Sequence, residues 1–220
     1  MAIEVIFFDV GETLIDETRM WEGWAHYLGV PAPIFSAMLD EAIENGEHHR
    51  KVFERLRPDF DRENALRERA AEGKTYLFDR DDLYPDAAPC LRALRERDYL
   101  IGVAGNQPRG AVQTISKLGL EIDFVAASAD WGVAKPSLKF FERIIGLSQR
   151  APTKIAYVGD RLDNDVLPSK AAGITSIFLE RGPWGRTHAK LSEASLADIW
   201  IKSLIELPEA LSAFEIRCGR

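Results

Sequence analysis

The sequence has few cysteines, no excess of basic residues and no long apolar run. Its 220 residues include only two cysteines, Cys90 and Cys218. Two cysteines provide neither a disulfide framework nor the spacing of a metal site, so a reducing compartment is the simplest interpretation. The formal net charge is −7. This acidic balance argues against a surface built to bind nucleic acid.

The apolar residues are spread through the chain in short runs. None approaches the ~18 consecutive residues that a membrane-spanning helix needs. The first residues lead directly into the apolar run 5–8, and the acidic Glu4 stands where a signal peptide would carry basic residues. We therefore expect a cytoplasmic protein with no membrane or nucleic-acid partner. The length suits one large domain, or one domain with a modest insertion.

Five of the short apolar runs have the length of strands that are buried on both faces of a parallel sheet. They cover residues 5–8, 100–104, 124–127, 155–158 and 175–179. Segments with helical spacing lie between the later runs, at residues 87–97, 110–118, 137–145 and 166–172. Strands that alternate with helices predict an α/β protein, in which helices cover both faces of a parallel sheet.

Residues 16–82 interrupt this alternation, because they contain no convincing strand. Their apolar side chains recur at helical spacing, as at Trp21, Trp24 and Leu28. Prolines and glycines divide the segment into about four helices. The sequence thus predicts an all-helical module at residues 16–82, inserted into a core formed by residues 1–15 and 83–220. Its ends, near Asp16 and Tyr84, would act as hinges.

Polar residues and glycines follow four of the predicted strands. Ligands of open α/β sheets bind at the carboxyl ends of the strands, so these residues are the candidates for a site. They are Asp9 and Gly11 after the first run, Gly105 and Asn106 after the second, Lys135 beyond the third, and Asp160 and Asp165 after the fourth. Carboxylates on two strand ends, a lysine and loop N–H groups could together hold a metal ion and an anion.

These four segments, in this order and spacing, resemble the four motifs of the haloacid dehalogenase-like (HAD) superfamily. The resemblance extends over nearly the whole chain, and the helical insertion matches the family's cap domain. It implies a Rossmann-like core with a mobile helical cap. It also implies a hydrolase, most simply a phosphatase that uses Mg²⁺ and acts on a small phosphorylated substrate.

The resemblance implies a role for each matching residue. Asp9 matches the nucleophile, which forms a covalent aspartyl intermediate. Lys135 matches the lysine that offsets charge on the nucleophile and on the phosphoryl oxygens. Asp160 matches a principal Mg²⁺ ligand, and Asp165 matches an acidic residue that binds the ion directly or through water. Mg²⁺ is usually held by one or two carboxylates together with the substrate, which fits Asp9 and Asp160 on adjacent strand ends.

Two glycines depart from the family pattern. Gly11 stands where the phosphatases carry a second aspartate, the general acid and base, and Gly105 stands where they carry a serine or threonine. The Gly11 carbonyl can still bind the metal, and the N–H groups of Gly11, Gly105 and Asn106 can still bind an anion. Loss of acid–base help typically costs ~10²–10⁴ in rate. A good leaving group, such as an acyl phosphate, would tolerate that loss best.

Other residues could supply the missing acid. Glu12 follows Gly11, but side-chain direction reverses at each step of an extended segment. The plainer interpretation is that Glu12 is exposed or hydrogen-bonds the backbone of a flap. His48 and His49 lie in the insertion and could protonate a leaving group near neutral pH. Their plainer interpretation is as surface histidines.

Alternative functions remain open at this point. The chain could be a binding or regulatory protein that keeps the metal and anion site but has lost turnover. It could also be a dehalogenase or a phosphonate-cleaving enzyme. In the family, the dehalogenases carry a tyrosine at the position of Gly11. The phosphonate-cleaving enzymes carry an alanine there and add a lysine from the cap. Gly11 matches neither. Lys51 and Lys74 lie in the insertion, where a solvated lysine is the better interpretation of both.

Two further segments lie on the ligand side of the predicted sheet. Residues 181–185, with the sequence Arg-Gly-Pro-Trp-Gly, suggest a turn that either shapes a substrate pocket or packs within the protein. Asp163 and Asn164 follow Asp160 and are natural N-caps for the next helix. We therefore place Asp163 and Asn164 outside the site.

Overall fold

The computed structural model describes residues 2–219, which divide into two compact units. One unit is Glu17–Phe78, and the other is the remainder of the described chain. The smaller unit begins one residue after, and ends four residues before, the insertion predicted at residues 16–82. Most of the difference arises at the C-terminal end of the insertion, where the short helix η1 (Arg80–Asp82) belongs to the larger unit.

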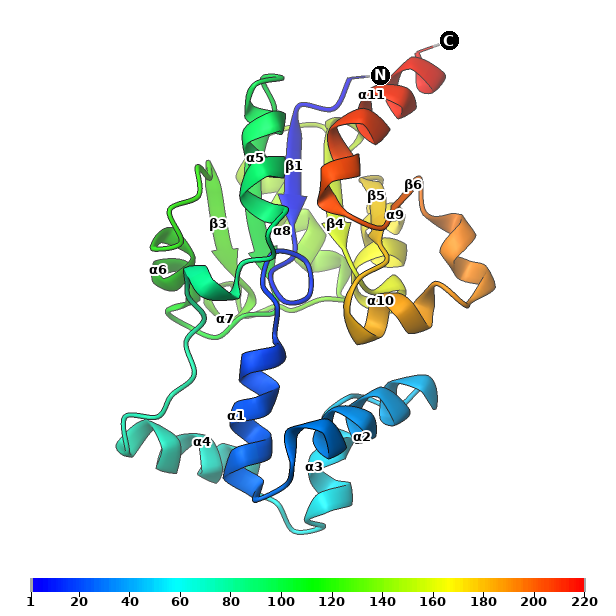
Figure 1. Ribbon diagram of the computed structural model, residues 1–220. Coiled ribbons are helices and arrows are strands. Elements are labelled where there is room, and N and C mark those ends of the chain that lie inside the picture. The colour runs from blue at the N-terminus through cyan, green and yellow to red at the C-terminus, as the bar shows by residue number, and fades with distance from the viewer. Residues whose placement is uncertain (1, 220) are drawn as a thin grey trace. The chain divides into compact units, whose positions relative to one another are not determined.

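The larger unit is built on a six-stranded sheet, in which the strand order is β3-β2-β1-β4-β5-β6 and every neighbouring pair is parallel (Figure 1). The strands are β1 (Val5–Phe8), β2 (Leu100–Gly105), β3 (Phe124–Ala127), β4 (Ile155–Gly159), β5 (Thr175–Leu179) and β6 (Ile199–Ile201). All five predicted strands are present, and β6 is an additional one at the sheet edge. This is a Rossmann-like α/β fold, as the sequence predicts.

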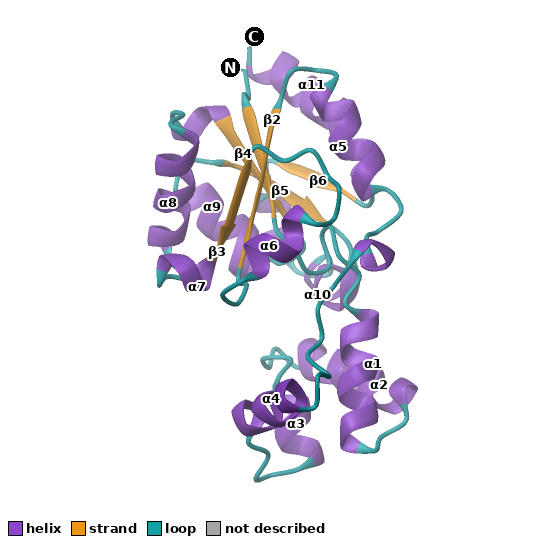
Figure 2. Ribbon diagram, turned by 90° about the vertical axis from the view of Figure 1, so that its left-hand side faces the viewer, coloured by secondary structure: helices purple, strands orange, loops and turns teal. Residues whose placement is uncertain are grey.

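Helices cover both faces of this sheet (Figure 2). They are α5 (Ala87–Arg95), α6 (Ala111–Ser116), α7 (Ser128–Trp131), α8 (Leu138–Ser148), α9 (Leu167–Ala171), α10 (Gly182–His188) and α11 (Leu207–Cys218). In Figure 2, α8 and α9 lie on one side of the strands and α5 and α11 on the other. Phe140, Phe141 and Ile144 recur at helical spacing on α8, and all three are buried against the sheet.

The smaller unit consists of four helices, as predicted. These are α1 (Thr18–Leu28), α2 (Ala32–Glu44), α3 (Lys51–Leu56) and α4 (Arg62–Ala71). Aromatic rings form much of its interior: the Phe53 ring lies 5.1 Å from that of Trp24 and 5.2 Å from that of Phe60. Asp61 caps α4, because its side chain accepts a hydrogen bond from the N–H of Asn64. None of the helices in residues 2–219 is both long and apolar enough to cross a membrane.

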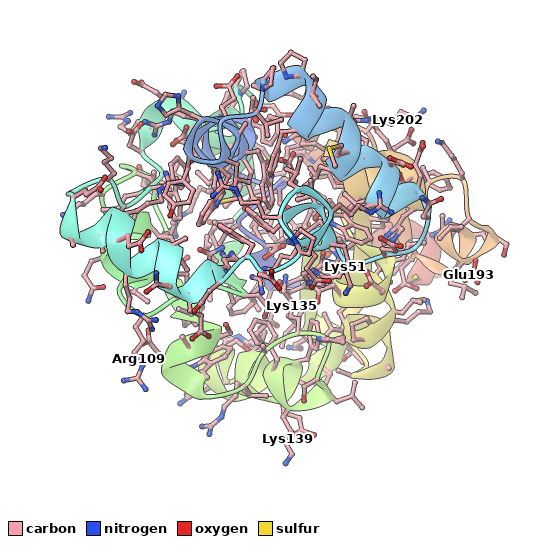
Figure 3. The ribbon with its side chains drawn as sticks, turned by 90° about the horizontal axis from the view of Figure 1, so that it is seen from below. Lys51, Arg109, Lys135, Lys139, Glu193 and Lys202 are labelled. Carbon is pink, nitrogen blue, oxygen red and sulfur yellow. The ribbon has the colours of Figure 1, made fainter. Side chains whose placement is uncertain are left out.

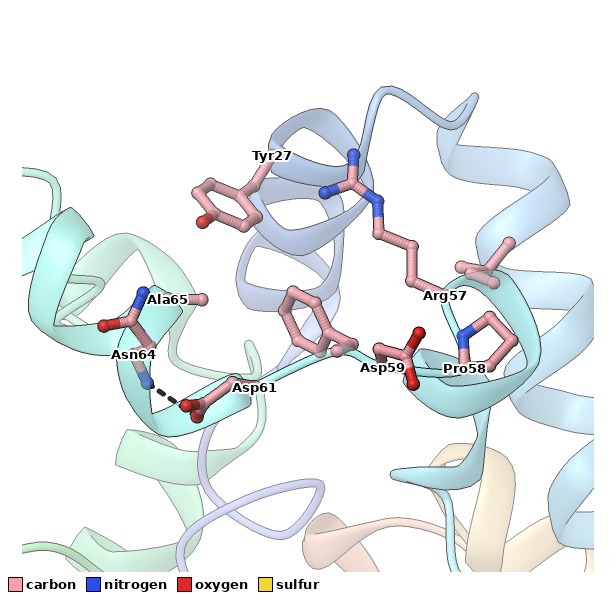
Figure 4. A pocket seen from close by; sticks show the side chains of 9 residues that line it. Tyr27, Arg57, Pro58, Asp59, Asp61, Asn64 and Ala65 are labelled. Atoms are coloured by element: carbon pink, nitrogen blue, oxygen red, sulfur yellow. Dashed lines mark hydrogen bonds between the residues drawn. The ribbon is translucent and has the colours of Figure 1, made fainter.

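A shallow depression of about 490 Å³ lies on the smaller unit (Figure 4). Its lining residues are Tyr27, Leu56, Arg57, Pro58, Asp59, Phe60, Asp61, Asn64 and Ala65. No predicted site residue is among them. The chemistry that the sequence predicts therefore lies elsewhere, at the ends of the strands.

The two segments that lead to and from the smaller unit are paired with each other inside the larger unit. Ile15 and Leu83 form an antiparallel bridge. The Asp16 N–H donates to the Asp82 carbonyl at 2.8 Å, and the Tyr84 N–H donates to the Leu14 carbonyl at 2.9 Å. The chain thus leaves the sheet and returns to it next to the loop that follows Asp9.

Candidate active site

Three buried carboxylates converge at the carboxyl end of the sheet. Asp9 follows β1 and Asp160 follows β4, which are neighbouring strands in register. Ligand oxygens of Asp9, Asp160 and Asp165 all lie within 4.8 Å of one another. Gly159 permits this approach, because a Cβ at its position would clash with the Asp165 carboxylate. The three acidic residues predicted at separate places in the sequence therefore form one cluster.

Lys135 completes the cluster from the loop that follows α7, beyond β3. Its Nζ lies 2.7 Å from Oδ1 of Asp9 and 2.6 Å from Oδ1 of Asp165, and its side chain is fully buried. Figure 3 shows Lys135 within the molecule, whereas Lys139 and Arg109 point outward. Burial alone would lower the pKa of Lys135, but the carboxylates of Asp165 and Asp9 outweigh it and raise this pKa. Lys135 is therefore a charged ammonium at neutral pH.

The backbone and ammonium group of Lys135 contact two side chains: that of Asn106, which follows β2, and that of Tyr157, which lies in β4. The Asn106 amide donates to the Lys135 carbonyl at 3.0 Å, and its Oδ1 accepts from the Lys135 N–H at 2.8 Å. The Lys135 Nζ lies 5.4 Å from the centre of the Tyr157 ring. Asn106 thus positions the lysine with its side chain, while anion binding by its N–H remains a prediction.

The cluster carries an excess of buried negative charge. Three carboxylates face one ammonium, a balance of −2 when all are ionised. Burial, followed by the carboxylates of Asp165 and Asp9, raises the pKa of Asp160 well above its usual range. Burial also raises the pKa of Asp165 to about 6, although Lys135 opposes this shift. Buried charges in proteins are normally paired or coordinate a metal, so the cluster fits a divalent cation.

The donor atoms also fit a magnesium ion. Oδ2 of Asp160 is buried and has no hydrogen-bond partner among the described residues. A buried carboxylate oxygen without a partner costs free energy unless a cation binds it. All the converging ligands are carboxylate oxygens, the type that Mg²⁺ prefers. Asp165 differs from Asp160, because its oxygens already accept from Lys135 Nζ at 2.6 Å and from the Arg161 N–H at 3.0 Å.

The two glycines that depart from the family pattern lie beside Asp9. A Cβ at Gly105 would clash with Oδ1 of Asp9. The Asp9 carboxylate therefore occupies space that the family's serine or threonine would need. Gly11 forms a bridge with Ile15 in the tight loop after β1. Binding of a metal by the Gly11 carbonyl remains a prediction.

Glu12 lies in the same loop with an unusual backbone conformation. Its φ is 53°, a left-handed value that is uncommon for residues other than glycine. It is buried, and its Oε2 accepts a hydrogen bond from the Tyr84 hydroxyl at 2.5 Å. The interpretation that Glu12 is exposed is therefore wrong, and this partner is a side-chain hydroxyl rather than the backbone of a flap. A catalytic role for Glu12 remains a prediction.

The other candidate acids and lysines belong to the smaller unit. The rings of His48 and His49 lie 4.3 Å apart. Their role as proton donors remains a prediction. Lys51 pairs with Glu54 at 2.6 Å, and both side chains are about half exposed. Lys74 pairs with a glutamate at 2.9 Å and is more exposed still. Both lysines are solvated, as the sequence suggests.

Two features of the loops beyond β4 and β5 differ from the sequence interpretation. Residues 182–188 form the helix α10 rather than a turn. Residues 162–166 form a single π-helical turn, η3 (Leu162–Val166), and Asp163 pairs with Arg161 at 2.6 Å instead of capping a helix. The sequence does not predict α10 as a helix, because it contains a proline and two glycines, which usually interrupt helices.

A parallel sheet with acidic residues at adjacent strand ends, a buried lysine between them and a helical insertion after the first strand defines a class of α/β hydrolases. The profile of the haloacid dehalogenase-like hydrolase family matches residues 3–173. This match covers well over half of the chain, and the chain belongs to that family. It is therefore a hydrolase.

Individual relatives agree with this assignment. A glyceraldehyde 3-phosphate phosphatase of Pyrococcus furiosus is 26% identical over 95% of this chain and 93% of its own length. A glyceraldehyde 3-phosphate phosphatase of Methanopyrus kandleri is 33% identical, but the match spans less than half of each protein, 46% of this chain and 45% of the relative. The HAD-hydrolase YfnB of Bacillus subtilis shares the fold, with a TM-score of 0.70 and 18% identity over 96% of this chain and 99% of YfnB.

Proposed function

We propose that this protein is a Mg²⁺-dependent phosphatase that acts on a small phosphorylated metabolite through an aspartyl intermediate at Asp9. The observation that carries the proposal is the buried cluster of three carboxylates and one lysine. When all four groups are ionised, the cluster has a net charge of −2, which a divalent cation would neutralise. A relative that is similar along nearly its whole length, and that acts on glyceraldehyde 3-phosphate, supports a phosphorylated substrate.

Asp9, Asp160 and the carbonyl of Gly11 would hold the ion, with Asp165 bound to it through a water molecule. The engagement of both Asp165 oxygens within the protein favours this indirect contact. When bound, Mg²⁺ would neutralise charge on the phosphoryl oxygens and so lower the barrier to attack by an anionic nucleophile.

The reaction that we propose has two displacements at phosphorus. An Asp9 oxygen attacks, the bond between phosphorus and the leaving oxygen breaks, and the aspartate carries the phosphoryl group. A water molecule then attacks the same phosphorus, and the bond between phosphorus and the Asp9 oxygen breaks. The protons of the water stay on the phosphate that leaves, and the carboxylate of Asp9 is restored. Lys135 holds Asp9 in place and offsets charge that builds up during both displacements. Residues 16–82 would be the helical cap of the family.

The absence of a side chain at Gly11 restricts the leaving group. A poor leaving group must be protonated as it departs, and the usual aspartate is missing here. The leaving group of an acyl phosphate is a stable carboxylate, which needs little protonation. We therefore propose that this phosphatase favours acyl phosphates, or other substrates with good leaving groups, over simple alkyl phosphates.

A panel of alkyl phosphates and acyl phosphates, assayed with Mg²⁺ and with a chelator, tests the proposal. We expect phosphate release that requires Mg²⁺ and is abolished by Asp9→Asn. The matched control is Asp130→Asn, which removes an exposed carboxylate on α7 and should leave the rate unchanged. Denaturing mass spectrometry after brief mixing should find a phosphorylated form of the wild-type protein that Asp9→Asn lacks.

Other results would favour the alternative functions. Tight binding of phosphate or vanadate without any turnover would identify a binding or regulatory protein. Release of halide from 2-haloacids without metal would identify a dehalogenase. Turnover that persists in Asp9→Asn would rule out the aspartyl intermediate.

A further inference from the structure

Helix α10 and the arginine before it contact both of the loops that carry metal-binding residues. These loops are residues 10–15, which follow Asp9, and residues 161–166, which follow Asp160. The contacts come from different positions of one short segment, residues 181–188, which we call the brace. The proposed reaction uses none of the brace residues, although the sequence places them on the ligand side of the sheet.

The first half of the brace holds the Asp9 loop. The Arg181 guanidinium donates to the Thr13 carbonyl at 3.0 Å and lies 4.1 Å from the centre of the Tyr84 ring. Tyr84 in turn donates to Glu12. Gly182 has a φ of 65°, and a Cβ on it would lie 2.6 Å from Oε2 of Glu12. Glycine at this position therefore allows the brace to pack directly against the loop.

The second half of the brace holds the Asp160 loop. The Arg161 guanidinium lies 3.9 Å from the centre of the Trp184 ring and pairs with Asp163 on its own loop. One turn further along α10, Nδ1 of His188 accepts a hydrogen bond from the Leu162 N–H at 3.0 Å. This N–H lies two residues after Asp160, so the helix fixes the backbone where the chain turns away from the carboxylate.

The two loops emerge from neighbouring strands, but the sheet alone fixes only their first residues. Beyond the strand ends, the brace connects them through the buried His188 and the partly exposed Arg181 and Trp184. We propose that residues 181–188 hold the Asp9 and Asp160 loops at the separation that Mg²⁺ binding requires, with Trp184 and His188 as positioning residues. This inference rests on the proposed function, because it takes the carboxylate cluster to be a Mg²⁺ site.

Mg²⁺ affinity measured by titration calorimetry on chelator-treated protein tests the brace without reference to turnover. Trp184→Leu removes the ring that stacks on Arg161, and His188→Leu removes the acceptor for the Leu162 N–H. Loss of groups that orient metal ligands typically weakens binding by about 10–100-fold, and we expect a loss in this range for both variants. His188→Asn should bind Mg²⁺ nearly as the wild type does, because Oδ1 of asparagine can replace Nδ1.

A control separates positioning from general stability. Trp200→Leu alters an exposed tryptophan on the edge strand β6, whose ring lies 5.4 Å from that of Phe178, and should leave Mg²⁺ affinity unchanged. The melting temperature of each metal-free variant is measured in parallel. If the brace variants melt earlier but bind Mg²⁺ as tightly as the wild type, the brace is only structural and the inference is wrong.

The histidine pair keeps the test decisive if Trp184→Leu does not fold. Equal Mg²⁺ affinity in His188→Leu and His188→Asn would contradict the inference. Failure of the wild-type protein itself to bind Mg²⁺ would contradict the proposed metal site as well. Wild-type binding with unaffected variants would contradict the brace alone.

Discussion

At the residue scale, the two glycines that depart from the family pattern have different consequences. Gly11 lacks the carboxylate that would protonate a leaving group, which restricts the proposed reaction to substrates with good leaving groups. Gly105 allows the Asp9 carboxylate to occupy its present position, because any Cβ there would meet Oδ1 of Asp9. In that position Asp9 also contacts Lys135. Gly105 is therefore part of how this chain places its proposed nucleophile.

This relationship predicts the effect of restoring the family's residue. Gly105→Ser should displace the Asp9 carboxylate from Lys135, and a misplacement of ~1 Å can cost on the order of 10²-fold in rate. We expect kcat on an acyl phosphate to fall by that order. Gly146→Ser is the matched control, since a Cβ at Gly146 meets no atom within 4 Å. A rise in kcat would instead mean that the serine hydroxyl helps to bind the phosphoryl group.

At the scale of elements, the sequence predicts those whose burial leaves a clear pattern. β1, β3 and β5 have the predicted bounds, and β2 and β4 each extend one glycine further. These strands are covered on both faces, so their apolar runs are continuous. β6 escapes prediction because it has only three residues and exposes its central Trp200. α10 escapes because its composition is that of a turn.

At the candidate site, too, some features could be predicted from the sequence and others could not. Strand ends predict which residues come together, since parallel strands deliver their last residues to one edge. They do not predict the links between loops. The contact of Trp184 with Arg161, and that of His188 with the Leu162 N–H, join segments about 25 residues apart through side chains and a helix that the pattern does not reveal. The clustering of Asp9, Asp160 and Asp165 could be predicted, but the brace could not.

The contact between α10 and the Asp160 loop also predicts a dependence of stability on pH. Burial lowers the pKa of His188 below its usual value of 6.5, and Arg161 acts in the same direction against the opposing charge of Asp163. As the pH falls below 6.5, the unfolded chain binds a proton at this histidine before the folded protein does. The free energy of unfolding must therefore decrease as the pH falls through this range. Its slope against pH is set by the number of protons that the unfolded state binds in excess of the folded state.

Melting temperatures at pH 7.5 and pH 5.0 measure this effect. We expect the wild-type protein to lose more stability between the two values than His188→Asn, which keeps an acceptor for the Leu162 N–H and does not titrate. His26, His48 and His49 are present in both proteins, so their contributions cancel. Equal losses in the two proteins would show that His188 is not held neutral.

At the scale of the whole molecule, the proposed metal ligands and the insertion belong to different units. Asp9, Asp160, Asp165 and Lys135 all lie in the unit that contains the sheet, and none lies in Glu17–Phe78. The smaller unit has its own aromatic interior, built around Trp24 and Phe53. A chain with two such interiors need not unfold in a single step, so its thermal transitions can be assigned separately.

Mg²⁺ should therefore stabilise only the unit that contains the sheet. A ligand present at 100 times its dissociation constant adds about 2.7 kcal/mol to the free energy of unfolding. For a unit of this size, each kcal/mol raises the melting temperature by roughly 2–4 °C, which gives an expected increase of about 5–10 °C. In scanning calorimetry, the transition of the sheet unit should shift upward with Mg²⁺ and return with a chelator, while that of Glu17–Phe78 stays in place. Asp160→Asn removes the ligand whose buried oxygen has no partner among the described residues, so its transition should not respond. An equal shift in this variant would place the Mg²⁺ outside the carboxylate cluster and so contradict the proposed metal site.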